Sequence, residues 1–200
     1  MKLSTKFKES AKELKNIRSL AIMAMLIALC VIFEKFLVIP IAGNIKQIKL
    51  TIIPAAISGM LFGPIAGTIV VAAGDLLANI EMFSPLYSLS AIVTGLICGC
   101  MFYRQPKIGL KRIIVGVSLI TVLVYMVMNS CWVAFYGGLK KEWALLFRIL
   151  TILVQYPVDI VCVYVVFGRL YKIPFMHPFI FGEKRAVVKA NVKKATEELN

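Results

Sequence analysis

Polar side chains recur at helical spacing inside the apolar stretches of this chain, and they are the first candidates for binding a small molecule. Within each of three groups the spacing is three, four or seven residues, which places the group on one face of a helix. The groups are Asp75 and Asn79; Tyr125, Asn129, Trp132 and Tyr136; and Arg148, Gln155 and Asp159. Because polar groups inside a membrane span cost free energy and usually mark function, these faces predict a polar pocket between helices.

The sequence lacks the motifs of the common catalytic chemistries. It has no G-x-x-x-x-G-K-[ST] phosphate loop, no H-E-x-x-H and no G-x-S-x-G. Its one histidine, His177, follows the last apolar stretch, and its five cysteines lie in apolar runs without a C-x-x-C pair. We therefore expect no enzyme, no catalytic residue, no metal site, no cofactor and no use of ATP by the chain itself.

Composition and charge indicate a membrane protein. Of the 200 residues, 60% are hydrophobic and only 16% are charged, and the mean hydropathy is +0.87. The net charge of +13 comes largely from lysines and arginines before residue 19, between 104 and 112, and after 168. Such clusters are typical of cytoplasmic segments under the positive-inside rule. We interpret them as topology signals and contacts with the lipid bilayer, and we expect no nucleic-acid binding.

The apolar runs predict the spans. The run over 50–80 is too long for one span of about 20 residues, and the turn signal Gly63-Pro64 divides it. Two crossings in this run place both basic termini and the basic central loop on one side, as the charge rule requires. The expected spans are 18–38, 49–62, 65–80, 85–103, 110–136 and 144–170. We predict an all-α, multi-pass protein of the cell membrane with six transmembrane helices in residues 1–174, a basic tail over 175–200, and both termini cytoplasmic.

This topology brings most of the polar groups to one depth. The fifth span runs outward and carries Asn129 in its outer half, the third runs outward toward Asp75, and the sixth begins outside near Arg148. We therefore predict a pocket open to the outside, with a cationic rim and an aromatic wall. The predicted binding residues are Lys35, Lys49, Asp75, Asn79, Tyr87, Tyr125, Asn129, Trp132, Tyr136, Arg148 and Gln155. For the cationic and aromatic members the alternative is an interfacial belt, where such side chains are common.

Asp159 lies deeper in the sixth span than the other polar groups, two residues after Pro157. A proline frees a backbone carbonyl in a helix, and an acid beside it either pairs within the bundle or marks a moving element. The sequence leaves both interpretations open.

Small residues recur every four positions, a spacing that lets membrane helices approach closely. The stripes are Ala24 and Ala28; Ala55, Gly59 and Gly63; and Ala91, Gly95 and Gly99. One interpretation is packing within the chain. The other is that one stripe docks a partner membrane protein, and Ala24 and Ala28 are the candidates because they lie in the cytoplasmic half of the first span.

Four stretches together resemble the substrate-binding (S) components of energy-coupling factor (ECF) transporters, and among these the folate family. They are "AMLIALCVIFEKFLVIPI", "IIPAAISGMLFGPIAG", "YSLSAIVTGLICGCMFYR" and a last span that opens with Arg148 and contains Pro157. The resemblance covers residues 18–172. It implies a membrane-embedded subunit that binds a vitamin, folate or a related one, with high affinity.

The resemblance also implies partners and residue roles. An S component joins a transmembrane T component and two cytoplasmic ATPases, which energise import, and Ala24 and Ala28 would contact the T component. The carboxylates of a folate would bind to Lys35, Lys49 or Arg148. Its flat ring would stack on Trp132, Tyr136 or Tyr87. The edge of the ring would form hydrogen bonds with Asn129 and Asp75. We expect Lys35 to face the pocket and Glu34 to face the headgroups or a neighbouring cation.

Three alternatives stay open. Another ligand, such as queuosine, pantothenate or riboflavin, would keep the S-component assignment. A stand-alone secondary carrier would show internal repeats and a proton-relay carboxylate near the midplane, for which Asp159 is the candidate. A structural or assembly subunit would bind no ligand. Uptake by vesicles that lack the ATPases separates a carrier from an S component.

Overall fold

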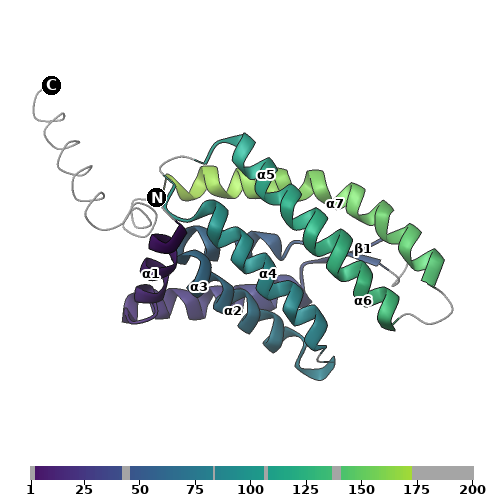
Figure 1. The fold of residues 1–200 in the computed structure, drawn as a ribbon, viewed down its shortest axis with the longest axis horizontal. Coiled ribbons are helices and arrows are strands. Elements are labelled where there is room, and N and C mark those ends of the chain that lie inside the picture. The colour runs from purple at the N-terminus through teal and green to yellow at the C-terminus, as the bar shows by residue number, and fades with distance from the viewer. Residues whose placement is uncertain (1–2, 42–45, 83, 106–107, 137–140, 173–200) are drawn as a thin grey trace, which may run out of the picture.

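Helices make up most of the structure, and one small sheet of two strands accompanies them (Figure 1). The computed structural model describes residues 3–41, 46–82, 84–105, 108–136 and 141–172. The helices are α1 Leu3–Glu13, α2 Ile17–Lys35, α3 Ile52–Ala78, the short η2 Ile80–Met82, α4 Pro85–Phe102, α5 Leu110–Ile120, the π-helix η3 Thr121–Met128, α6 Asn129–Tyr136 and α7 Lys141–Leu170. The strands β1 Val38–Ile41 and β2 Lys46–Lys49 pair antiparallel, with Val38 opposite Lys49.

Helix α3 consists of two arms joined by a sharp turn. Gly63 has φ 82° and ψ −165°, a conformation that residues with a side chain rarely adopt, and Pro64 follows it. A Cβ on Gly67 would lie only 3.0 Å from the Cα of Gly59, whereas an unbroken helix would hold these residues about 12 Å apart. The second arm therefore folds back along the first, and the predicted turn at Gly63-Pro64 is confirmed.

Five helical stretches of the described chain are long and apolar enough to cross a membrane: Ile17–Lys35, Ile52–Ala78, Pro85–Phe102, Leu110–Trp132 and Thr151–Leu170. The second of these contains both arms of α3, so the described chain has six apolar segments, and the predicted six-helix membrane fold is confirmed. The hairpin β1–β2 and the short helix α1 are elements that the sequence analysis does not predict. The predicted tail over 175–200 lies outside the described residues.

The first and last described helices both contact the segment that follows α4, at one end of the bundle. Arg104, just after α4, pairs with Glu9 of α1 at 2.5 Å. The hydroxyl of Tyr171, just after α7, donates a hydrogen bond to the backbone carbonyl of Gln105 at 2.9 Å. Figure 1 shows α1 at the opposite end of the bundle from β1. The α1 end carries the basic residues, so by the charge rule it is the cytoplasmic end and the hairpin lies at the outer end.

Close backbone contacts hold α3 against α4. A Cβ on Gly59 would lie 2.6 Å from the backbone carbonyl carbon of Cys98, and one on Gly99 would lie 2.4 Å from the Cα of Pro64. Because the atoms in the way are backbone atoms and the Cβ of Cys98, which is fixed to the backbone, neither position can accept a side chain without moving a helix. The small-residue stripes of these two helices therefore pack within the chain.

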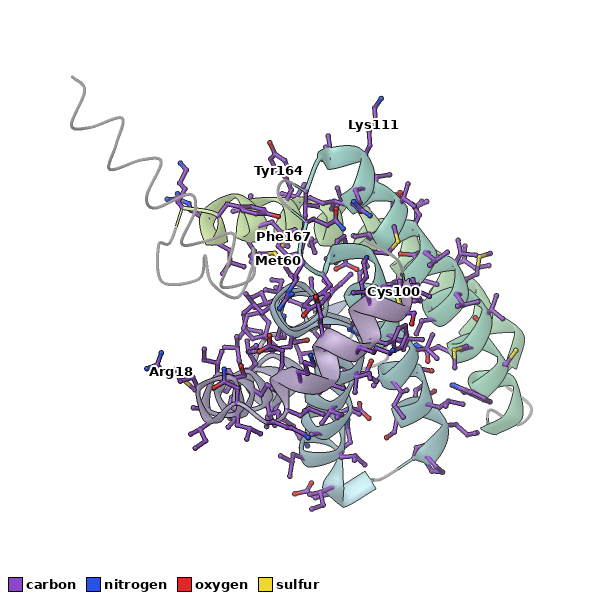
Figure 2. All side chains as sticks on the ribbon, turned by 60° about the vertical axis from the view of Figure 1, so that its left-hand side comes forward. Arg18, Met60, Cys100, Lys111, Tyr164 and Phe167 are labelled. Carbon is purple, nitrogen blue, oxygen red and sulfur yellow. The ribbon has the colours of Figure 1, made fainter. Side chains whose placement is uncertain are left out.

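Large apolar side chains fill the interior and charged ones leave it. Figure 2 shows Met60 and Phe167 inside the bundle, while Arg18 and Lys111 point away from it. The ring of Phe102 meets that of Phe167 edge to face, with 5.1 Å between the ring centroids. Phe102 ends α4 and Phe167 is close to the end of α7, so this contact lies toward the α1 end.

Candidate functional site

A cavity of about 440 Å³ lies toward the outer end of the bundle. Its walls come from the end of α2, the far ends of both α3 arms, the start of α4, the π-helix η3 and α7. Seven of the eleven predicted binding residues line it: Lys49, Asp75, Asn79, Tyr87, Tyr125, Asn129 and Gln155. Polar faces from separate stretches of the sequence thus meet at one cavity.

Glu34 faces the cavity, and its neighbour Lys35 does not. The carboxylate of Glu34 pairs with the ammonium of Lys49, and both residues line the cavity. Lys35 is exposed and lies outside the lining, so the structure does not bring Lys35 to the cavity as expected, whereas Glu34 does pair with a neighbouring cation. The reason is helical phase, since Cys30 is buried against the cavity and Glu34 lies one turn further along the same face of α2.

Two neighbours hold the carboxylate of Asp75 in place. Its Oδ1 accepts a hydrogen bond from Nδ2 of Asn79 at 3.1 Å, and its Oδ2 accepts one from the hydroxyl of Ser88 at 2.8 Å. Asn79 follows the second arm of α3 and Ser88 belongs to α4, so this carboxylate joins two walls of the cavity. Each oxygen keeps a further lone pair that can accept a hydrogen bond from a ligand.

Two other oxygen atoms of the lining are buried without a hydrogen-bond partner in the described part of the chain. They are Oδ1 of Asn129 and the hydroxyl oxygen of Ser84. Asn129 directly follows η3, and π-helical turns are frequent at functional sites. Buried polar atoms are normally paired, so a ligand that donates hydrogen bonds here would complete the wall.

The other predicted residues take different places. Gln155 donates a hydrogen bond from Nε2 to the backbone carbonyl of the last residue of β2, at 2.9 Å, and so ties α7 to the hairpin. Trp132 does not line the cavity, but its indole N–H donates to the hydroxyl of Ser90, which does, at 2.9 Å. Tyr136 ends α6 and Arg148 lies within α7, and their side chains fall outside the described part of the structure.

Asp159 does not line the cavity. Its side chain is fully buried, and neither carboxylate oxygen has a hydrogen-bond partner among the described residues. No salt bridge reaches Asp159 in the described part of the chain, and both interpretations, pairing within the bundle and a moving element, stay open.

The sequence analysis missed one of the two acids of the lining, and it missed the hydroxyl groups of its serines and threonines. These are Glu34, Thr51, Ser84, Ser88, Ser90, Thr94 and Thr151. A signal existed for two of them, because Ser84 and Ser88 are four residues apart and share one face at the start of α4. Serine and threonine are common in membrane helices, so spacing alone did not single them out.

The arrangement suits a flat ligand that carries N–H donors along one edge. Acceptors on Asp75, Asn129 and Ser84 line a cavity that also contains the rings of Tyr87 and Tyr125. The lining holds one ion pair and one further acid, and within the described residues no salt bridge reaches that acid. No group of three histidine, cysteine, aspartate or glutamate residues in the described part of the chain could hold a metal ion.

Comparisons with known proteins agree with this architecture. Residues 18–176 match the family model described as "ECF transporter, substrate-specific component". The chain is 32% identical over 155 residues to the folate transporter FolT of Clostridium novyi (strain NT), which covers 76% of this chain and 88% of that protein. It is 20% identical over 152 residues to the folate transporter FolT of Leuconostoc mesenteroides, which covers 72% of this chain and 80% of that protein.

A solved structure has the same fold. A crystal structure of FolT bound with folic acid matches with a TM-score of 0.70 and 24% sequence identity, over 77% of this chain and 95% of that one. The family model spans all six apolar segments described above. The chain therefore belongs to the substrate-specific (S) components of ECF transporters, which are multi-pass proteins of the cell membrane.

Proposed function

We propose that the chain is the folate-binding subunit of an ECF importer. The observation that carries the ligand is the 32% identity to a folate transporter over most of both chains. The cavity supports it, because folate has a flat ring system with N–H donors on one edge and carboxylates at its other end. The family is one of transporter subunits, and we propose that the chain itself catalyses no reaction.

The charges of the wall support one orientation of the ligand. Asp75 and Asn129 would accept hydrogen bonds from the ring edge, and Tyr87 and Tyr125 would contact the ring faces. The lining holds two acids against one cation, so the interior disfavours carboxylates. The carboxylates of the ligand would therefore lie toward Lys49 and the exposed Lys35 at the outer end of the bundle, and Gln155 would support Lys49 through its backbone.

The other predicted residues have indirect roles in the proposal. Trp132 would act through Ser90, to which its indole donates a hydrogen bond, and Asn79 would hold Asp75. Tyr136 and Arg148 stay predictions from the sequence, which places them at the outer ends of their helices, because their side chains lie outside the described part of the structure.

The partners follow from the family. We propose that a T component and two cytoplasmic ATPases energise import, and that Ala24 and Ala28 of α2 contact the T component. Both alanines are exposed in the isolated chain, and Met25 beside them is 72% exposed, so this face is free to receive another helix. Residues 175–200 would form a basic cytoplasmic tail beyond the membrane domain of 1–174.

Quenching of tryptophan fluorescence tests the ligand. Trp132 touches the cavity wall through Ser90, so a bound folate should quench its emission. After correction for absorption of light by the ligand, we expect folic acid to quench saturably at a ratio of one ligand per chain, and riboflavin, pantothenate and queuosine to cause no saturable quenching. Asp75→Asn is the matched control for binding in this cavity, because it should weaken the quenching without removing either of the two tryptophans, Trp132 and Trp143. Saturable binding of another vitamin in place of folic acid would overturn the folate assignment.

A further inference from the structure

We propose that Ser10 is a positioning residue of the ligand cavity: from α1, its hydroxyl caps the turn between the two arms of α3 and so sets how far apart the arms stand where they form the cavity walls. The inference rests on the proposed function only in so far as the cavity binds the ligand. The capping itself is a property of the apo chain.

The turn in α3 leaves backbone groups that need partners. The first arm ends with carbonyls that have no helical N–H to accept from, and the second arm begins with N–H groups that have no helical carbonyl. A helix usually solves this with a Ser, Thr, Asp or Asn at its N-cap. Here the N-cap position is Gly63, which has no side chain. A Cβ on it would lie 3.0 Å from the ring of Tyr103 and 3.1 Å from the Cβ of Ser10.

Ser10 supplies the missing cap from another helix. Its hydroxyl donates a hydrogen bond to the carbonyl of Phe62 at 2.6 Å, and its oxygen accepts from the N–H groups of Ile65 and Ala66, each at 3.0 Å. One donor and two acceptor positions are all that a hydroxyl has, so the group is fully used. The side chain is fully buried, and it joins the last turn of one arm to the first turn of the other.

Other contacts fix α1 at this place. The ammonium of Lys6 donates to the backbone carbonyl of Cys100 at 2.5 Å, and Arg104 pairs with Glu9 at 2.5 Å and with Glu13 at 3.4 Å. These partners lie at the end of α4 or just after it, and α4 is the helix that packs most closely on α3. The position of Ser10 is thus set by α4 and by the turn together.

The angle between the two arms at the turn sets the distance between their far ends, which line the cavity. The first arm brings Ile52 and Ala55 to the lining, and the second brings Gly74 and Asp75. An arm of about twelve residues is about 18 Å long, so a tilt of about 5° at the turn would move its far end by about 1.6 Å. Displacements of this size separate a fitted hydrogen bond from a lost one.

The test measures the arms and the ligand separately. Nitroxide labels on non-canonical amino acids at Ile53 and Leu77, near the far ends of the two arms, report the inter-arm distance in full-length protein by pulsed electron spin resonance. We expect Ser10→Ala to broaden or shift the distance distribution without ligand, and to weaken folic acid binding to the unlabelled protein by about fivefold or more. Ser10→Cys keeps a side chain of similar size with a weaker hydrogen-bond donor, so it should change the distance distribution and the affinity less than Ser10→Ala does. This variant allows the test to be made if the alanine variant does not fold.

Ser19→Ala is the matched control. Ser19 is also a fully buried serine, and its hydroxyl donates to Oε2 of Glu13 at 2.7 Å without touching the turn. Arg104 pairs with the other oxygen of Glu13 and with Glu9, so α1 keeps its contacts with the end of α4 in this variant. It should lower the melting temperature but leave the inter-arm distance and the affinity unchanged. An unchanged distance distribution in the Ser10 variants overturns the proposal, and so does a changed distribution with unchanged affinity. If the wild-type chain does not bind folic acid, the proposed function fails, and the distance distribution still decides whether Ser10 sets the arms.

Discussion

The ammonium of Lys49 pairs with the carboxylate of Glu34 between the end of β2 and the end of α2. Gln155 of α7 holds the same lysine by its backbone carbonyl at 2.9 Å. Three walls of the cavity therefore meet at Lys49. A ligand carboxylate that approaches this lysine must compete with Glu34, so the ion pair sets how strongly the outer end of the cavity attracts an anion.

Lys49→Met should weaken folic acid binding by about tenfold or more, because it removes a cation of the lining and leaves Glu34 unpaired beside the ligand. Lys35→Gln should weaken binding only a few-fold at low salt, because an exposed charge acts at a distance and is screened. Titration calorimetry of both variants at low and high salt measures the difference. A larger and salt-independent loss in Lys35→Gln would show that Lys35, and not Lys49, receives the ligand carboxylate.

Asp75→Asn should lower the affinity for folic acid by about 10- to 100-fold, the effect of losing one hydrogen bond to a charged acceptor. Ser88→Ala should lower the affinity for folic acid by a smaller factor, because Asn79 still donates a hydrogen bond to the carboxylate at 3.1 Å. Fluorescence titration with folic acid measures the affinities of the two variants and of the wild type. An affinity of wild-type strength in Asp75→Asn would contradict the placement of the ring edge at this residue.

Asp159→Asn should raise the melting temperature of the apo protein, by a few degrees for about 1 kcal/mol. The side chain is fully buried, so the neutral isostere removes the desolvation cost of a carboxylate. The same change at Asp75 is the control, since it replaces one of two accepting oxygens with an NH2 group, disrupts one of the two hydrogen bonds and should lower the melting temperature. A strong loss of stability in Asp159→Asn would mean that the ionised carboxylate has a partner in the folded protein.

Tyr103 should make the stability fall at high pH. This side chain directly follows the observed span Pro85–Phe102 and is fully buried, and burial raises the pKa of its hydroxyl well above the usual value of about 10. The unfolded chain then ionises Tyr103 before the folded one does, so its contribution is complete below about pH 10 and is lost as the pH rises further. Melting curves between pH 8 and 11 should show a steeper loss for the wild type than for Tyr103→Phe. Parallel curves would contradict this.

The course of the chain through the membrane was largely predictable from the sequence. Apolar runs of span length and basic clusters are properties of composition, and Gly63-Pro64 is a local turn signal that α3 obeys. The meeting of Asp75, Asn129 and Gln155 at one cavity also followed, because topology and helical spacing together place side chains in depth and on a face.

The rotation of α2 about its axis and the contacts of α1 with the rest of the bundle were not predictable from the sequence. Glu34 and Lys35 are adjacent, and their assignment depends on the rotation of α2 about its axis, which the buried Met23 and Cys30 determine. Helix α1 lies outside the apolar runs, and its role depends on contacts between Ser10 and residues more than fifty positions away. Such contacts exist only in the folded chain.

Native mass spectrometry of the detergent-purified chain tests the central claim most directly, because it identifies the small molecule that stays bound. We predict a one-to-one complex whose added mass is that of a folate, and its loss in Asp75→Asn. A different vitamin in the wild-type complex would keep the S-component assignment and contradict folate as the ligand. A chain that emerges empty and stays empty after incubation with folic acid would contradict the proposed function altogether.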